Sequence, residues 1–196
     1  MAHRWHIPRH PSPFGAIHEF WQAVGVRWGT PKPPDVWDPR GQEAPPVTAL
    51  SIQESLYPDL TCFGCGHANP KGFHLRSFRD GEFTVAEFTS SPEHDNGFGF
   101  LNGGIITTVL DCHTAAVVMW ESAQREWVAD PGAPVPFITS GLDVRFLRPT
   151  PLATTVQLSA RPEHISEQEI VVAAELSAEG KPRASLTATW LRFHPR

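Results

Sequence analysis

The feature that most constrains this chain is one long apolar segment, residues 103–123, followed by four strand-like runs. Apolar side chains fall on nearly every side of the helix that this segment would form, so the helix must be covered all round. A curved antiparallel sheet wrapped around one long central helix would provide that cover. We therefore predict an α+β fold of this kind. The apolar residues in question are Ile105, Ile106, Val109, Leu110, Ala115, Ala116, Val117, Val118 and Met119.

The runs after the helix alternate between apolar and polar residues and are rich in β-branched side chains, which is typical of half-buried strands. A hairpin signal at Asp80-Gly81 joins two further runs before the helix, and Glu179-Gly180 joins the last two runs after it. Residues 51–57 favour a short helix, and residues 61–72 read as a turn-rich loop. The six predicted strands span residues 73–78, 84–89, 138–147, 154–161, 169–178 and 184–193.

Residues 1–50 differ in composition from the rest of the chain, because they hold nine of its 20 prolines and four of its seven tryptophans. The apolar spacing over residues 16–28 favours one short helix, which the following prolines would end. We predict a Pro/Trp-rich N-terminal extension over 1–50 and one domain over 51–196. Since exposed tryptophan is costly, we expect the extension to pack on this domain or on a partner subunit.

Composition excludes several classes of partner. The net charge is -5 and no cluster of lysine and arginine stands out, so we expect no nucleic-acid partner. Three cysteines are too few for a disulfide scaffold and favour a reducing compartment. The most apolar segment is interrupted by Asp111, which argues against a membrane span. We therefore expect a cytoplasmic protein.

The start of the long helix has the make-up of an oxyanion site. Gly103 and Gly104 open it after a glycine-rich loop, and a helix N-terminus offers unpaired N–H groups with partial positive charge. Asp111 follows eight residues later, about 12 Å along the axis, among apolar residues where burial raises a carboxyl pKa. One helix cannot easily place Gly103 and Asp111 on the same small atom, but two antiparallel copies could. This geometry predicts a homodimer with its site at the interface.

Three motifs resemble those of the PaaI-like hot-dog fold acyl-CoA thioesterase superfamily. Asn102-Gly103-Gly104-Ile105, with Thr107, Leu110 and Asp111, resembles its central signature, H/N-G-G-I-x-x-T-L-x-D. Residues 62–73, with C-x-G-C-G followed by N-P-x-G-F, resemble an upstream segment, and residues 139–149 resemble a strand that ends in R-P. The resemblance covers roughly residues 60–193 and implies the hot-dog fold, with the helix inside the curved sheet.

This resemblance implies hydrolysis of an acyl-CoA or acyl-carrier thioester, with no metal and no cofactor. Asp111 would activate water or attack the carbonyl, and the Gly103 N–H would polarise the thioester oxygen. Asn96 and Thr139 match two further residues of the site. In the family, the acid and the hydroxyl come from one subunit, and the glycine and the asparagine come from the other. The assembly implied is a homodimer or a dimer of dimers.

Other positions would bind substrate rather than react. Asn102 stands where many members have histidine, and asparagine cannot act as acid or base near neutral pH, so we expect it to position substrate or cap the helix. Gly104 adds a second N–H at the helix start. Arg148, and to the same degree Arg145, could meet the phosphates of coenzyme A. The departure at Asn102 keeps open an alternative, a non-catalytic acyl-CoA-binding hot-dog module.

Several residues also have plainer interpretations. Asn96 could be only a turn residue, and His113 reads as a buried, hydrogen-bonded histidine. Cys112 reads as a small core residue. Cys62-x-x-Cys65 lacks the second ligand pair of a zinc site and the helix of a redox site, so we interpret it as a structural turn. Gly64 and Gly66, in and beside this turn, would then take unusual dihedrals.

Overall fold

The computed structural model describes residues 50–195, and all but the last residue of the predicted extension lies outside them. The predicted helix over residues 16–28 and the packing of its tryptophans are therefore outside the described residues. The elements follow in the order α2 (Ile52–Leu56), β1 (Ser77–Asp80), β2 (Phe83–Thr89), η1 (Pro92–His94), α3 (Gly103–Gln124), β3 (Phe137–Phe146), β4 (Thr155–Ile165), β5 (Glu169–Ala178) and β6 (Lys181–Arg192).

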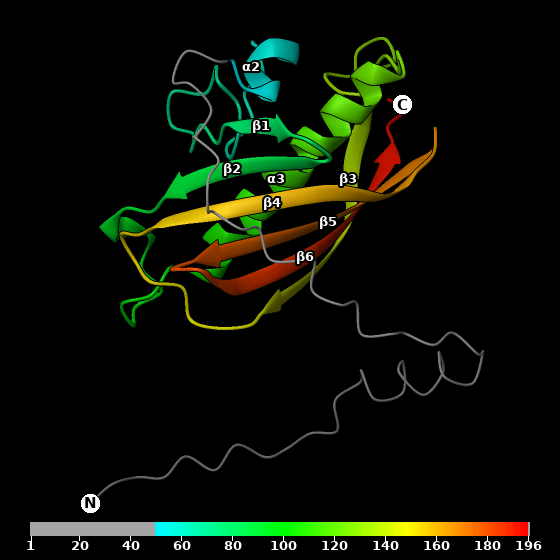
Figure 1. The fold of residues 1–196 in the computed structure, drawn as a ribbon. Coiled ribbons are helices and arrows are strands. Elements are labelled where there is room, and N and C mark those ends of the chain that lie inside the picture. Colours follow the sequence, from blue (N-terminus) through cyan, green and yellow to red (C-terminus); the bar gives the residue numbers. More distant parts are fainter. Residues whose placement is uncertain (1–49, 196) are drawn as a thin grey trace, which may run out of the picture. The chain divides into compact units, whose positions relative to one another are not determined.

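The strands form one antiparallel sheet in the order β1-β2-β4-β5-β6-β3. The sheet curves around α3, which runs along one of its faces (Figure 1). Alternate residues of β5 are buried along its whole length, as expected for a strand that faces a core on one side. This confirms the predicted α+β hot-dog architecture.

α3 begins where the sequence predicts it, because Asn102 caps it. The Asn102 Oδ1 accepts a hydrogen bond from the Gly104 N–H at 2.7 Å, which satisfies one of the unpaired groups of the first turn. Its middle is fully enclosed: Val109, Leu110 and Ala116 have no exposed surface. The helix is long and apolar enough to cross a membrane, but 61% of its most apolar stretch is buried within the domain. Burial of this extent is typical of a core helix.

Three predicted strands differ from those observed, and the last, predicted over 184–193, begins three residues earlier as β6 (Lys181–Arg192). The run predicted over 73–78 becomes a strand only from Ser77, since the backbone before it bonds to the preceding loop: Phe73 N–H donates to Phe63 O at 2.8 Å and Leu75 N–H donates to Gly64 O at 3.0 Å. The strand predicted over 154–161 continues to Ile165 as β4. Both predicted hairpin turns are present.

A bulge in β3 changes which side chains face the helix. The register shifts between Thr139 and Gly141, so that Thr139 pairs with the buried Trp190, whereas Leu142 pairs with the buried Ala188. Alternation along a strand is strict, so the extra residue turns Leu142 to the same face as Thr139. Phe146, opposite the buried Ala184, shares that face.

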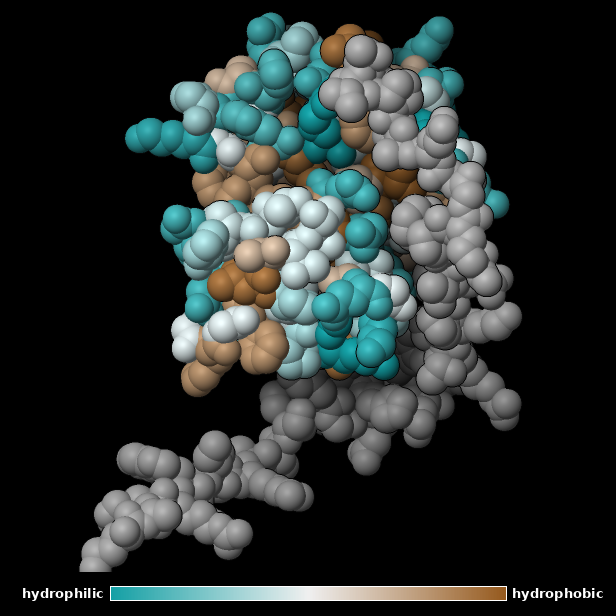
Figure 2. Space-filling model, turned by 60° about the vertical axis from the view of Figure 1, so that its left-hand side comes forward, coloured by the Kyte–Doolittle hydropathy of each residue, from teal (hydrophilic) through white to brown (hydrophobic). Residues whose placement is uncertain are grey.

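Apolar side chains on this domain are not all covered. β3 is an edge strand, and its Leu142 and Phe146 are 37% and 57% exposed although they face the side of the sheet on which α3 lies. Phe98 and Phe100, in the loop before α3, are exposed as well. Figure 2, which brings the left-hand side of Figure 1 forward, shows hydrophobic residues at the surface among hydrophilic ones.

A buried hydrogen-bond chain joins α3 to the elements before it. His113 Nδ1 lies 3.0 Å from Ser77 Oγ, and His113 Nε2 lies 3.1 Å from Thr84 O. Gln53 donates to Ser77 Oγ and accepts from the Ser77 N–H. Buried polar groups are tolerated when they are paired in this way. The interpretation of His113 as a buried, satisfied histidine is confirmed.

Candidate active site

The structure brings together Asp111 and Thr139, which are 28 residues apart in the chain. Thr139 Oγ1 donates a hydrogen bond to Asp111 Oδ1 at 2.9 Å. The carboxyl of Asp111 is half-buried, and burial raises its pKa. The Thr139 hydrogen bond opposes that effect because it stabilises the ionised form, and the nearby Cys62 sulfur adds to the rise. The result is a carboxylate held in one orientation at the edge of the core.

The helix start carries Asn102, Gly103 and Gly104 within one turn. The Gly104 N–H is occupied by the Asn102 side chain, so the cap predicted for Asn102 is confirmed and Gly104 has a structural partner. Gly103 is the first helical residue, and its N–H has no carbonyl one turn earlier to bond. The Phe146 ring lies over it, since a Cβ at Gly103 would stand 3.2 Å from Phe146 Cζ.

Asn96 organises the loop that leads into α3. Its Oδ1 accepts from the N–H groups of Phe98 at 2.8 Å and Phe100 at 3.4 Å, while Asp95 Oδ1 accepts from Gly97 and Gly99. These are the Asx turns that Asp and Asn favour. Within a single subunit, Asn96 is therefore a turn residue, as the alternative interpretation predicted. Its catalytic role stays a prediction.

The two arginines proposed for substrate binding lie on or just beyond β3. Arg148 is exposed and donates from Nη1 to Pro182 O at 2.9 Å, which holds its side chain against the start of β6. Arg145 is exposed too, and its Nε lies 3.2 Å from Asp143 Oδ1. Neither arginine contacts Asp111 or Gly103 in the described part of the chain.

Within one chain, the predicted residues form two separate groups. Asp111 and Thr139 make one group. Gly103, Asn102 and the Asn96 loop make the other, which lies about 12 Å away along α3 at the rise of an α-helix. This separation is the one that the sequence predicted.

Sequence reasoning missed a cluster of three thiols beside Asp111. The sulfur atoms of Cys62, Cys65 and Cys112 all lie within 4.8 Å of one another, and all three cysteines are free. Hydrogen bonds from the other two thiols, together with backbone N–H groups, hold the pKa of Cys62 well below its usual range. A clue was present in the sequence, since Cys112 directly follows Asp111. The contact of Cys112 with Cys62, 50 positions earlier, depends on tertiary folding.

The glycines around this turn are needed for space. A Cβ on Gly64 would lie 2.2 Å from Cys112 Sγ, and one on Gly66 would lie 2.3 Å from the Cys62 backbone nitrogen. Neither residue has the positive φ seen at Gly81 and Gly180. The prediction of unusual dihedrals at Gly64 and Gly66 is therefore wrong in its reason. Close approach of the loop to α3 requires glycine at 64, and close approach of the loop to its own backbone requires glycine at 66.

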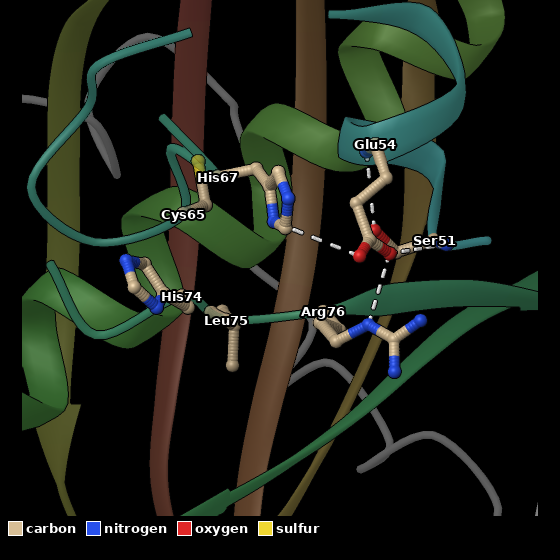
Figure 3. Close-up of a pocket in the computed structure, with 7 residues that line it drawn as sticks. All are labelled: Ser51, Glu54, Cys65, His67, His74, Leu75 and Arg76. Carbon is tan, nitrogen blue, oxygen red and sulfur yellow. Dashed lines mark hydrogen bonds and ion pairs between the residues drawn. The ribbon is translucent and has the colours of Figure 1, made fainter. Parts of the chain in front are cut away.

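A pocket of about 280 Å³ opens on the outer side of this loop. Figure 3 shows Cys65 at its wall beside His67, with Glu54 pointing toward His67 and Arg76. Arg76 Nε donates to Glu54 Oε2 at 2.9 Å, and His67 Nδ1 lies 3.7 Å from Glu54 Oε1. Asp111 does not line this pocket.

Comparison with known proteins finds a family similar to part of this chain. The model of the thioesterase superfamily matches residues 98–184, which include Asp111, Gly103 and Thr139. No curated protein matches the chain.

Solved structures resemble the chain along most of their own length. A thioesterase superfamily protein from Shewanella loihica PV-4 is 29% identical, covers 65% of this chain and 97% of its own, and has a TM-score of 0.50. The PaaI protein from the phenylacetic acid degradation operon of E. coli is 20% identical, covers 74% and 97%, and has a TM-score of 0.55. A Streptococcus mutans UA159 protein, solved bound to acetyl-CoA, is 18% identical, covers 62% and 90%, and has a TM-score of 0.50.

These findings confirm the resemblance that the three motifs indicated. The E. coli and S. mutans structures support the fold, and the family model adds the central signature. Residues 98–184 of this chain are thus similar to the thioesterase superfamily, and its fold is the PaaI-like hot-dog fold.

Proposed function

We propose that this protein hydrolyses an acyl-CoA thioester, with Asp111 as general base or nucleophile. The observation that carries the proposal is the hydrogen bond from Thr139 to the half-buried Asp111 carboxylate, on a helix whose first N–H, that of Gly103, has no partner within residues 50–195. An oriented acid and a preorganised N–H donor are the two groups that acyl transfer from a thioester needs.

The reaction needs only groups of this kind. As general base, Asp111 takes a proton from water while the water oxygen bonds to the thioester carbonyl carbon. The carbonyl oxygen gains negative charge, which the Gly103 N–H of a second subunit stabilises. The C–S bond then breaks, and the proton held by Asp111 passes to the leaving sulfur, giving a carboxylic acid and a free thiol. If Asp111 attacks directly, an acyl-enzyme forms and water releases the acid in a second step.

A homodimer would complete the site. Edge strands expose unpaired backbone groups, and on β3 exposed Leu142 and Phe146 add apolar surface on the side of α3. A second copy paired along β3 by a two-fold axis would cover this surface and bring its own helix start toward Asp111. The separation of the two residue groups within one chain supports this arrangement.

The substrate class follows from the family and from one neighbour. The S. mutans structure of the same fold holds acetyl-CoA. In this chain Arg148, just beyond the end of β3, offers a cation near the helix start for a coenzyme A phosphate. An acyl group on a carrier protein has the same thioester chemistry and is a second form of this substrate.

The test is thiol release from a panel of short, long and aromatic acyl-CoA substrates by the wild type and by Asp111→Asn. We expect turnover in the wild type and a fall in kcat of about 10²- to 10⁴-fold in the variant, the usual contribution of a general base. Asp143→Asn is the matched control, because it removes an exposed carboxylate from β3 and should retain full activity.

A specific observation keeps the alternative in view. The Asn102 side chain caps α3 and supplies no acid or base, which suits a module that binds acyl-CoA without turnover. Tight binding of a panel member by the wild type, with no thiol released, would establish that alternative and reject the thioesterase.

A further inference from the structure

We propose that Cys62, Cys65 and Cys112 form a binding site for one thiolate-bound metal ion, Zn²⁺ by the chemistry of the donors. Three free thiols converge here. Cys62 and Cys65 lie in one loop, and Cys112, 50 residues after Cys62, lies on α3. Sequence analysis counted only the Cys62-x-x-Cys65 pair, and two ligands are too few for zinc. The fold supplies the third.

The distances suit a tetrahedral ion. Zinc–sulfur bonds are about 2.3 Å long, so two sulfurs on one tetrahedral zinc stand about 3.8 Å apart. The sulfurs of Cys62 and Cys112 lie 3.7 Å apart, and Cys65 Sγ lies within 4.8 Å of both. The fourth ligand of tetrahedral zinc can be water, as in other sites with three protein ligands.

The loop around the cluster is shaped for this convergence. Gly66 N–H donates to Cys62 O at 2.9 Å, which closes a tight turn between the two loop ligands. Gly64 leaves room for Cys112 Sγ where any side chain would collide with it. The N–H groups of Gly64 and Cys65 bond to the Cys62 sulfur. Bonds to ligand sulfurs of this kind are typical of the outer shell of metal–thiolate sites.

The donor set also selects the class of ion. Thiolates are soft ligands that favour zinc and similar metals, whereas magnesium and calcium prefer oxygen. A disulfide is the competing use of such thiols, but the 3.7 Å between Cys62 and Cys112 is far from the S–S bond length of about 2.05 Å. A disulfide would use two of the three adjacent thiols and leave the third over, whereas a metal site would use all three.

The position of the ion would link two parts of the domain. Cys112 lies on α3 directly after Asp111, and Cys62 and Cys65 lie in the loop that packs over this part of the helix. A bound ion would fasten that loop to the helix. The proposal does not depend on thioesterase activity, and its tests do not measure it.

The first experiment loads the reduced, full-length wild-type chain with Zn²⁺ or Co²⁺ under argon, after purification without a metal-affinity tag. We expect one zinc per chain by elemental analysis, release by a chelator, and recovery on addition of zinc. The Co²⁺ form should show sulfur-to-metal charge-transfer absorption, which histidine or carboxylate ligands do not produce. Mg²⁺ should not compete.

Variants then identify the ligands. Cys62→Ser and Cys112→Ser should each weaken zinc binding by more than about 100-fold, since loss of an outer-shell partner alone costs about 10- to 100-fold. His67→Asn is the matched control from the same loop, because its exposed ring faces Glu54, and it should bind zinc as the wild type does. Circular dichroism of each chain checks folding, and the chelator experiment needs no variant at all.

Three outcomes would overturn the proposal. One is reduced wild type that binds no zinc at micromolar concentration. Another is zinc binding that persists unchanged in Cys112→Ser, which would assign the ion to other ligands of the chain. The third is a stable disulfide, seen as one titratable thiol per chain instead of three in protein kept under argon.

Discussion

At the scale of single residues, Asp111 shows how burial and one hydrogen bond act together. Burial raises the pKa of its carboxyl, and the Thr139 hydroxyl acts in the opposite direction by stabilising the anion. Thr139 binds Oδ1 of Asp111, so in the proposed reaction the second carboxylate oxygen, Oδ2, would act on water or substrate. Thr139 is thus a positioning residue for the proposed base.

Replacing Thr139 by valine keeps the shape of the side chain and removes this hydrogen bond. We expect kcat to fall by about 10- to 100-fold, because hydrogen bonds to charged groups are worth about 1.5–3 kcal/mol. Thr139→Ser retains the hydroxyl and should recover most of the activity. Equal thiol release by Thr139→Val and the wild type would remove Thr139 from the site.

His113 makes stability depend on pH. Burial, opposed only in part by the hydrogen bond to Thr84, lowers its pKa to about 4 from an ordinary value of about 6.5. The unfolded chain therefore binds a proton that the folded chain excludes, so stability is full above pH 6.5 and is lost as pH falls toward 4. A charged group also reaches the strand that contacts His113, since Arg79 Nη1 donates to Thr84 Oγ1.

The measurement is urea unfolding of metal-free protein between pH 4 and 7. His113→Gln should have a lower free energy of unfolding than the wild type at pH 7. Between about pH 6.5 and 4, its free energy of unfolding should lose the part of the pH dependence that His113 contributes. His164→Gln, an exposed position on β4, is the control and should keep that slope. If His113→Gln keeps the pH dependence of the wild type, that dependence belongs to other titratable groups.

At the scale of elements, the start of α3 and the bulge in β3 decide what the site contains. The Asn102 cap uses the Gly104 N–H, so the Gly103 N–H keeps no hydrogen-bond partner among the described residues. The bulge turns Thr139 and Leu142 to the same side, so β3 presents a hydroxyl to Asp111 and an apolar surface next to it. A regular strand would direct one of them away.

Gly103→Pro removes this N–H with little cost to the helix, because proline is favoured at the first helical position. Asn102, at φ -61° and ψ 135°, already has the backbone that a residue before proline prefers. We expect kcat to fall by about 10²- to 10³-fold, the loss measured for one oxyanion donor. Gly103→Ala keeps the N–H and adds the same Cβ near Phe146, so it should stay close to wild type. Similar losses in both variants would point to crowding at Phe146 instead.

At the scale of the whole molecule, the proposed site needs two copies of the chain. Asp111, which binds Thr139, lies eight residues along α3 from Gly103, where the Asn96 loop ends. β3 also carries exposed apolar side chains on the side of α3. A two-fold axis would combine the first group of one subunit with the second group of its partner.

Mixing two inactive variants tests this directly. Asp111→Asn and Gly103→Pro subunits, exchanged or co-expressed, should form heterodimers in which one site carries both changes and the other carries none. Half of the dimers are mixed and each has one intact site, so about a quarter of wild-type activity should return. Light scattering should show a dimer or a dimer of dimers. No recovery in confirmed heterodimers would place Asp111 and Gly103 in the same subunit's site.

Most of the fold could be predicted from local pattern. The apolar length of α3, its Asn102 cap and the alternation in β5 act over a few residues, and these elements appear within one or two residues of the predicted bounds. The start of β1 was predicted wrongly, because residues 73–76 have strand-like alternation but bond to a loop that only the fold brings beside them.

By itself, the sequence determined the elements, the family signature and the approximate 12 Å between Gly103 and Asp111, because helix rise and capping depend on neighbours in the chain. The tertiary structure alone decided which side chains meet. The bulge that aims Thr139 at Asp111 and the loop that brings Cys62 against Cys112 join residues 28 and 50 positions apart. Such contacts arise from packing of the sheet and loop on α3, which no local pattern in the chain encodes.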